Sequence, residues 1–231
     1  MKNLSKTSNC SACNIGIQSL FKNLTKEDIE LIETNRLEVT FKPNETIFKQ
    51  GTNASHIICL HSGIVKIYTE SKKSNFILEL VKPVEFVGLQ SVFGDKVFHC
   101  TTTSIENVSA CFINIDIIKS IISHNNNFCI DIINFISRKA LFITNRATNI
   151  ARKNMNGRIA DVLMYLSNEI YNANPFPVTI SRQDIADLTA MSKESVIRTL
   201  KNFKNSGIIK EEDKYIEILK FDLLNQISEH G

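Results

Sequence analysis

The sequence predicts an α+β fold in which an antiparallel β domain is followed by a long helix and then by short helices that end in a β hairpin. Two observations support this prediction. Between residues 39 and 115, short β-rich runs alternate with turn residues, and from residue 116 the apolar residues change to helical spacing. The 231 residues, 43% of them hydrophobic, are enough for one large domain or two smaller ones with a buried core.

The composition argues against several classes of protein. No apolar run approaches the roughly 18 to 20 residues of a membrane span, and the first residues, MKNLSKTSNCSAC, lack the apolar core of a secretory signal. We therefore expect a cytoplasmic protein without a membrane partner. We see no phosphate-cradling glycine loop and no nucleophile with a matched base, so we assign no catalytic residues and do not expect an enzyme.

The N-terminal part begins with a capping box, Thr25 with Asp28, which predicts a short helix. The β-rich runs that follow are ETIFK, HIICLH, IVKIYTE, NFILELV and SACFINI. Turn residues separate these runs, for example in KQG and HSG. This alternation predicts an antiparallel β roll, a sandwich or barrel, within residues 1–115.

The segment 116–153 contains no proline or glycine and carries an unbroken apolar seam three heptads long. Starting from Cys129, steps of four and three residues reach Ile133, Ile136, Ala140, Ile143, Ala147 and Ile150. A second apolar set projects to another side of the same helix and consists of Phe128, Ile132, Phe135 and Phe142. Two apolar surfaces need two partners, so we predict that one packs on the β domain and the other forms a homodimer. The alternative is a single buried helix in a monomer.

From residue 154 the pattern becomes short helices with their own caps. Ser181 with Asp184 forms a second capping box, and Ser192 can cap the next helix after the tight connection Ala190-Met191. We expect the inner face of that helix to consist of Val196, Ile197, Leu200 and Phe203. Gly207 suits a left-handed helix end, and two β-rich runs flank the polar turn EEDK. Two helices, a tight turn and a hairpin indicate a winged helix-turn-helix over residues 154–231.

Cations gather on the second helix of this motif. The net charge of the whole chain is only +3, but residues 191–210 carry one anion, Glu194, and five cations: Lys193, Arg198, Lys201, Lys204 and Lys210. Such a helix enters the DNA major groove, where its first turns meet base edges and neighbouring polar groups hold phosphates. We expect base contacts from Lys193, Glu194, Ser195 and Arg198, and phosphate contacts from Ser181, Arg182, Gln183 and Lys201, with Ser192 at the same helix start. The alternative for each is a solvated helix face.

The sequence resembles the Crp/Fnr family of bacterial transcription regulators over nearly its whole length. SRQDIADLTAMSKESVIRTLKNFKNSGII is similar to the family's helix-turn-helix signature, and NGRIADVLMYL to the start of its DNA-binding domain. The strands containing KQG, HSG and FVG are similar to its cyclic nucleotide-binding-like β roll. The resemblance implies a homodimer with a sensory roll, a roughly palindromic operator in double-stranded DNA, and RNA polymerase as a partner. It places the principal base-reading side chains at Lys193, Glu194 and Arg198.

The resemblance also bears on the effector. In cAMP-binding relatives, a Gly-Glu turn precedes an Arg-Ser pair that holds the phosphate. The matching stretch here keeps Gly88 but has Leu89-Gln90 in place of the acid and His99-Cys100 in place of the Arg-Ser pair. We therefore expect a chain closer to the Fnr-like branch and not dependent on cAMP, because an unpaired phosphate charge would be costly to bury.

Six cysteines, Cys10, Cys13, Cys59, Cys100, Cys111 and Cys129, favour reduced thiols or metal ligands over a disulfide framework in a chain without a secretion signal. In the oxygen-sensing Fnr branch, an N-terminal cysteine cluster and one central cysteine hold an iron–sulfur cluster. Cys10, Cys13 and Cys111 match three of those positions, but the fourth would fall near Ser19, where no cysteine stands. Four thiolates are the usual requirement, so a cluster would need Cys100, a histidine or an outside ligand. The resemblance thus implies a response to redox, oxygen or nitrosative signals.

Two alternatives to this sensor stay open. In the first, Cys10 and Cys13 are thiols of an N-terminal leader, and Cys111 is a strand residue packed in the roll. In the second, the CSAC motif binds metal or carries electrons in a redox protein without a regulatory DNA-binding role. The clustered cations argue against the second alternative, because electron transfer gives no reason for a cationic helix face.

Overall fold

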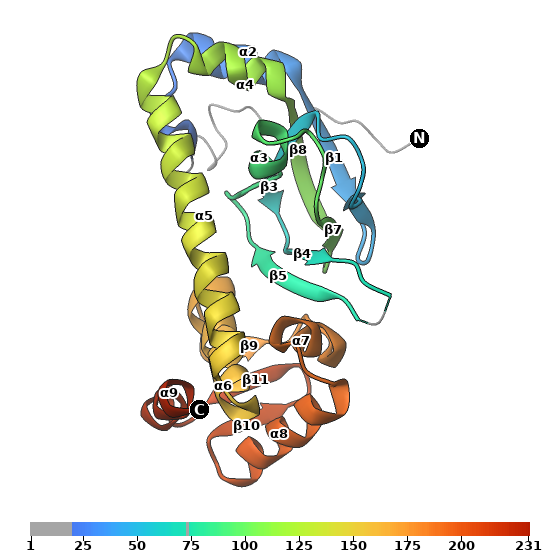
Figure 1. Cartoon of the computed structure of the whole chain (residues 1–231), viewed down its shortest axis with the longest axis vertical. Helices are drawn as coiled ribbons and strands as arrows, with labels where there is room; N and C mark the ends of the chain where they lie inside the picture. The colour runs from blue at the N-terminus through green and yellow to red at the C-terminus, as the bar shows by residue number, and fades with distance from the viewer. Residues whose placement is uncertain (1–19, 73) are drawn as a thin grey trace. The chain divides into compact units, whose positions relative to one another are not determined.

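The computed structural model describes residues 20–72 and 74–231, whose elements are drawn in Figure 1. The described residues divide into two compact units. The first unit runs as far as Thr69 and resumes at Leu80–Phe142, and the second comprises Glu70–Glu79 and Ile143–Gly231. Within the described ranges, no helix is both long enough and apolar enough to cross a membrane.

The first unit opens with a short 3-10 helix, η1 (Leu20–Asn23), and helix α2 (Lys26–Asn35). The predicted capping box is confirmed. The Asp28 amide donates to Thr25 Oγ1, and the Thr25 amide donates to Asp28 Oδ2, each over 3.2 Å. Helix α2 lies against α4 (Ile115–Ile122), as Figure 1 shows, and buries Ile32 in the core of the unit.

Two four-stranded sheets form the predicted β domain (Figure 1). The first has the order β1 (Arg36–Phe41), β8 (Val108–Asn114), β3 (His56–Ser62) and β6 (Phe86–Val87). The second has the order β2 (Thr46–Phe48), β7 (Thr101–Ser104), β4 (Val65–Thr69) and β5 (Phe76–Val81). The pairs β1–β8, β3–β8, β3–β6, β2–β7 and β4–β7 are antiparallel. Strand β3 supplies much of the core, since residues 57–60 are at most 1% exposed.

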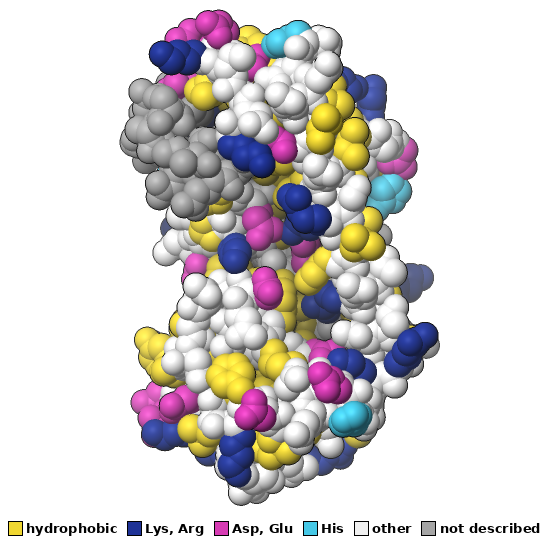
Figure 2. All heavy atoms as spheres, turned by 90° about the vertical axis from the view of Figure 1, so that its left-hand side faces the viewer, with side chains coloured by type: hydrophobic (Ala, Val, Ile, Leu, Met, Phe, Trp, Pro, Cys, Tyr) yellow, Lys and Arg dark blue, Asp and Glu magenta, His cyan; other side chains and the backbone are white. Residues whose placement is uncertain are grey.

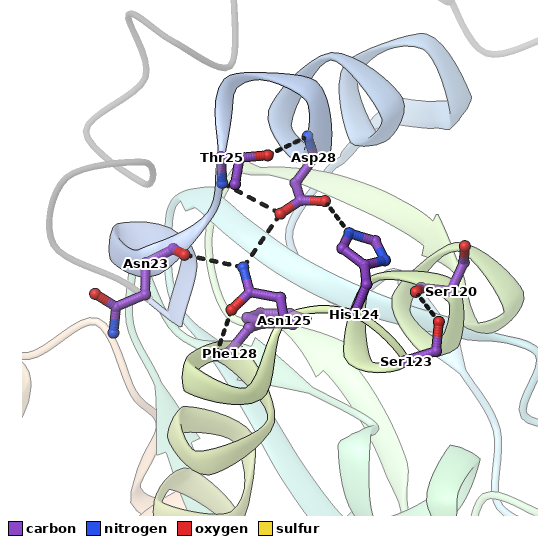
Figure 3. A network of polar contacts seen from close by, with 8 residues as sticks. All are labelled: Asn23, Thr25, Asp28, Ser120, Ser123, His124, Asn125 and Phe128. Atoms are coloured by element: carbon purple, nitrogen blue, oxygen red, sulfur yellow. Dashed lines mark hydrogen bonds and ion pairs between the residues drawn. The ribbon is translucent and has the colours of Figure 1, made fainter.

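The prediction of one uninterrupted helix over residues 116–153 is wrong. Helix α4 ends at Ile122, and a second helix, α5 (Asn126–Arg152), begins after a short turn. Asn125 causes this break: its side-chain oxygen accepts from the Phe128 amide over 3.0 Å and so caps the first turn of α5 (Figure 3). The predicted core-facing set is confirmed in its first three members, because Phe128, Ile132 and Phe135 are buried.

The second unit is built from short helices and a small sheet. Its helices are α6 (Met155–Tyr165), a π turn η2 (Leu166–Ile170), α7 (Arg182–Thr189), α8 (Lys193–Asn205) and α9 (Phe221–His230). Its three-stranded sheet has the order β10 (Ile209–Glu212), β11 (Tyr215–Ile218) and β9 (Phe176–Pro177). Helix α9 packs on α6 so closely that a Cβ atom on Gly157 would lie 3.3 Å from the carbonyl oxygen of Ile227.

Candidate nucleic-acid interface

Helices α7 and α8 form the predicted helix-turn-helix, and both of its predicted caps are confirmed. At the start of α7 the Asp184 amide donates to Ser181 Oγ over 3.0 Å, and the Ser181 amide donates to Asp184 Oδ2 over 2.9 Å. At the start of α8 the Ser195 amide donates to Ser192 Oγ over 3.2 Å. Ala190 makes the turn in the left-handed conformation, with φ of 51° and ψ of 43°.

The inner face of α8 differs from the prediction at one position. Val196, Leu200 and Phe203 are buried, but Ile197 is 47% exposed. Thr199 takes the fourth inner place, with 3% exposure. Each residue turns an α-helix by about 100°, so Val196 and Ile197 cannot face the same narrow stripe of core. Helix α8 packs so that Thr199, and not Ile197, faces the core of the unit.

The outer face of α8 carries charge that is not neutralised within the unit. Lys193, Glu194, Arg198 and Lys201 are exposed, and none of them forms an ion pair with any residue that the structure describes. By contrast, on the face drawn in Figure 2, basic and acidic side chains are interspersed, in keeping with a net charge of +3. Residues 191–210 carry five cations and one anion, and this local concentration of positive charge is what a site for a polyanion requires.

The residues predicted to hold phosphates at the start of α7 already have contacts in the chain. Ser181 is the cap, and the Gln183 side chain donates from Nε2 to Asp187 Oδ1 over 2.8 Å. Arg182 forms an ion pair with Glu211 of β10. This pair joins α7 to the hairpin and partly neutralises Arg182.

The hairpin β10–β11 is the wing, and its turn is tighter than predicted. Glu211 and Glu212 lie within β10, so only Asp213 and Lys214 form the turn, with Asp213 at a φ of 42°. Lys210 Nζ pairs with Glu212 Oε1 over 2.8 Å, and this hydrogen bond raises the pKa of Lys210. Lys210 is therefore held by the wing itself, and the wing offers DNA more acid than base.

Helix α5 carries the predicted dimerisation seam, and most of that seam is accessible. Ile133 is 57% exposed, Ala140 and Ala147 are exposed, and Ile136, Ile143 and Ile150 are half-buried. Two further exposed aliphatic residues, Ile130 at 55% and Leu141 at 65%, were missed because they fall outside the heptad count.

Comparisons with known proteins agree with this architecture. The family model for the cyclic nucleotide-binding domain matches residues 38–125, and that for the Crp-like helix-turn-helix domain matches residues 157–227, together more than half of the chain. The chain belongs to the Crp/Fnr family of transcription regulators. Regulators of this family bind DNA and are dimeric, and the family is not one of enzymes.

Individual Crp/Fnr relatives match most of the chain at low identity. The transcriptional activator protein FnrA of Stutzerimonas stutzeri is 23% identical over 224 residues, which cover 93% of this chain and 90% of the relative. The fumarate and nitrate reduction regulatory protein of Escherichia coli K12 is 23% identical over 229 residues, covering 96% and 90%. The structure of FixK2 from Bradyrhizobium japonicum is similar in fold, with a TM-score of 0.77 at 16% identity, covering 83% of this chain and 96% of that one.

The stretch of the roll that contains Gly88 and His99 forms a turn, a short helix and a hydrogen bond to Asp95. Gly88, at a φ of 91°, makes the turn before α3 (Leu89–Phe93), and Leu89 is fully buried where the cAMP-binding relatives have an acid. His99 Nε2 lies 2.8 Å from Asp95 Oδ2. Hydrogen bonds from His99 and from the Val97 amide lower the pKa of Asp95, and this residue is exposed.

Of the three cysteines expected to hold a cluster, the structure describes only Cys111. Cys10 and Cys13 lie outside the described residues. Cys111 is buried on β8, its sulfur accepts from Arg36 Nη1 over 2.9 Å, and Cys59 lies opposite it on β3. Residues 20–72 and 74–231 contain no group of three or more histidine, cysteine or acidic side chains that could hold a metal ion.

Proposed function

We propose that this Crp/Fnr chain is a homodimeric regulator that inserts one copy of α8 into the major groove of each half of a roughly palindromic operator. The observation that carries the proposal is the outer face of α8, where Lys193, Glu194 and Arg198 are exposed and without an ion-pair partner among the described residues. Arginine and lysine read the acceptors of guanine, and a carboxylate accepts from cytosine N4, so these side chains suit base edges. Lys201, one turn further on, suits a phosphate.

The seam on α5 supports the dimer in this proposal. Exposed Ile133 of the seam lies on a helix of 27 residues, about 40 Å long, which is ample for a two-helix interface. A dimer would set two α8 helices one DNA turn apart, roughly 34 Å. An effector acts in this scheme by shifting the equilibrium between helix-pair arrangements that do and do not keep that spacing. RNA polymerase is the partner through which the bound dimer regulates transcription.

One experiment tests both parts. The purified chain is offered random duplex oligonucleotides, and the retained sequences are determined while sedimentation measures the oligomeric state. We expect an enriched palindrome and a dimer. Ile133→Asp should give monomers and lose operator binding, whereas Asn134→Asp, an equal change of charge on the same helix away from the seam, should do neither. A monomeric wild-type chain, or no enriched sequence, contradicts the proposal.

For the effector, we propose a redox-type signal received by cysteine and not cAMP. An iron–sulfur cluster would be held by Cys10, Cys13 and Cys111 with a fourth ligand from elsewhere. Such a cluster would make the protein responsive to oxidants, because oxidants can break the cluster. Cys111 fits this role in one respect, since the cationic guanidinium of Arg36 donates to its sulfur over 2.9 Å and would pair with the anionic sulfur of a metal ligand. Asp95 and buried Leu89 are unsuited to a cyclic phosphate.

The effector is tested by purifying the chain without oxygen, recording its visible spectrum and analysing iron and sulfide. Iron with sulfide that is lost in Cys10→Ser and kept in Cys129→Ser supports the cluster. A colourless, metal-free dimer that still selects its operator contradicts the cluster. Tight binding of cAMP in calorimetry contradicts the other half of this proposal.

A further inference from the structure

Ile197 stands out on α8 because it is a large aliphatic side chain on the polar side of the helix. It is 47% exposed, whereas Val196 before it is fully buried. In the described helix-turn-helix, every other large aliphatic side chain of α7 and α8, namely Ile185, Leu188, Val196 and Leu200, is buried. Packing within the unit therefore does not explain the choice of isoleucine at this position.

The spacing along α8 places Ile197 among the exposed charges. Residues three and four apart are neighbours on a helix surface, so Ile197 lies beside Lys193, Glu194 and Lys201. Arg198 follows directly, rotated by about 100° about the helix axis. All four of these neighbours are exposed. Ile197 is thus part of the face that is offered to DNA.

Because Ile197 is apolar, the exposed face of α8 is not purely charged. A side chain with no donor or acceptor cannot contact a phosphate or the polar atoms of guanine, cytosine or adenine with any gain. The major groove offers one apolar group to such a side chain, the 5-methyl group of thymine. A branched aliphatic side chain beside the carboxylate of Glu194 and the ammonium groups of Lys193 and Lys201 can cover that methyl group while its neighbours bond to adjacent base pairs.

We infer that Ile197 is a specificity-determining residue that reads the 5-methyl group of a thymine in each half-site. The inference rests on the proposed function, since it requires α8 to enter the major groove. It adds a class of contact that the charged residues cannot make. The half-site should therefore contain a thymine next to the base pairs that Glu194 and Arg198 contact, and the methyl group of that thymine should contribute to affinity.

The test removes the methyl group alone. After the operator has been selected with the wild-type chain, each thymine of the half-site is replaced in turn, in both halves, by deoxyuridine, and dissociation constants are measured by fluorescence anisotropy. At one position we expect the wild-type chain to lose affinity about fourfold for each half-site, as burial of one methyl group implies, and so about fifteenfold in total. The other positions should change little.

Variants then assign the effect to one side chain. Ile197→Ala should bind the thymine operator more weakly and no longer distinguish thymine from uracil at that position, while Ile197→Val should keep the distinction in part. Lys201→Ala is the matched control on the same face, and it should bind all duplexes more weakly but keep the full distinction. Circular dichroism melting shows whether each variant is folded.

The outcomes separate this inference from the function on which it rests. A wild-type chain that selects an operator but binds the thymine and uracil forms equally at every position overturns the inference and leaves the proposed function standing. The same holds if Ile197→Ala keeps the distinction. A chain that selects no operator overturns both.

Discussion

Two polar regions of the molecule differ in how their side chains are paired. In one region the side chains bond to one another and hold helices together, and in the other they are exposed and have no ion-pair partner among the described residues. At the junction of α2, α4 and α5, the buried carboxylate of Asp28 accepts hydrogen bonds from His124 over 2.8 Å, from Asn125 over 3.2 Å and from the Thr25 amide over 3.2 Å (Figure 3). On α8, Lys193 and Arg198 have no ion-pair partner among the residues described.

This contrast follows from the cost of burying polar groups. A buried acceptor that lacks its donors destabilises the fold, so the groups of the junction are paired with one another. Exposed groups remain hydrated and can exchange water for a ligand at little cost. Satisfied networks therefore hold elements together, as the junction does for α2 and the start of α5, whereas the exposed, hydrated charges of α8 stay available to a partner outside the chain.

The largest effect on stability should come from breaking the junction. Asp28→Ala leaves the side chains of His124 and Asn125 and the Thr25 amide without their acceptor, and we expect the free energy of unfolding to fall by about 3 kcal/mol. Urea denaturation measures it. Asp28→Asn keeps one acceptor oxygen and should lose clearly less. If Asp28→Ala unfolds at the same urea concentration as the wild type, the hydrogen bonds of Asp28 do not stabilise the fold.

The second test acts on the opposite region. Arg198→Ala should weaken operator binding about 30-fold for each half-site, because a guanidinium that bonds to guanine contributes about 2 kcal/mol of discrimination, and it should leave stability unchanged. Its affinity for random duplex DNA should stay nearly constant. Equal losses on both kinds of DNA would show that Arg198 does not read bases.

Lys201→Ala sharpens that result, since a phosphate contact behaves differently from a base contact. We expect it to bind operator and random DNA more weakly by the same factor. The slope of log affinity against log salt concentration should fall by about 1 for each protomer. An unchanged slope would mean that Lys201 makes no phosphate contact.

A smaller effect should come from the pair that joins α7 to the wing. Glu211→Ala removes an anion and releases Arg182, so we expect affinity for random duplex DNA to rise about threefold at low salt. Glu229→Ala on α9, where the carboxylate accepts from Asn225 over 3.0 Å, is the control for net charge alone. A rise of the same size in both variants would show that Arg182 is not involved.

The smallest effect should be the pH dependence of the junction. Burial alone would raise the pKa of Asp28, but the hydrogen bonds from His124, Asn125 and Thr25 outweigh it and lower that pKa below its ordinary value of 3.8. The same bond from His124 to Asp28 raises the pKa of His124 above 6.5. The stabilisation from Asp28 is lost as pH falls through its lowered pKa, and that from His124 is lost as pH rises through its raised pKa.

Stability from this pair is therefore fullest between pH 3.8 and 6.5 and declines above that window. Urea midpoints measured from pH 5 to 8 test the decline. His124→Gln keeps a hydrogen-bond donor but does not titrate, so its decline over this range should be shallower than that of the wild type. If the urea midpoints of the two chains decline in parallel, the titration of His124 does not cause the pH dependence.

Sequence patterns predicted the parts of this protein that depend on near neighbours. The capping boxes at Thr25 and Ser181 and the cap at Ser192 were predictable, because each needs only residues three positions apart. The core-facing residues Phe128 and Ile132 followed from helical spacing, and the antiparallel roll followed from the alternation of strands and turns. The resemblance to the Crp/Fnr family, based on the same segments, was confirmed by the two matched domains.

Only the tertiary structure decided the remaining features, because their partners are distant in sequence. Asn125 breaks the long helix with the help of Asn23 and Asp28, about a hundred residues away, and Arg182 is partly neutralised by Glu211, 29 residues on. The sequence pattern placed Ile197 on the inner face of α8. The helix packs through Val196 and Thr199 instead, which leaves Ile197 exposed. Local interactions specify the elements, whereas the side that each element presents depends on what the rest of the fold covers.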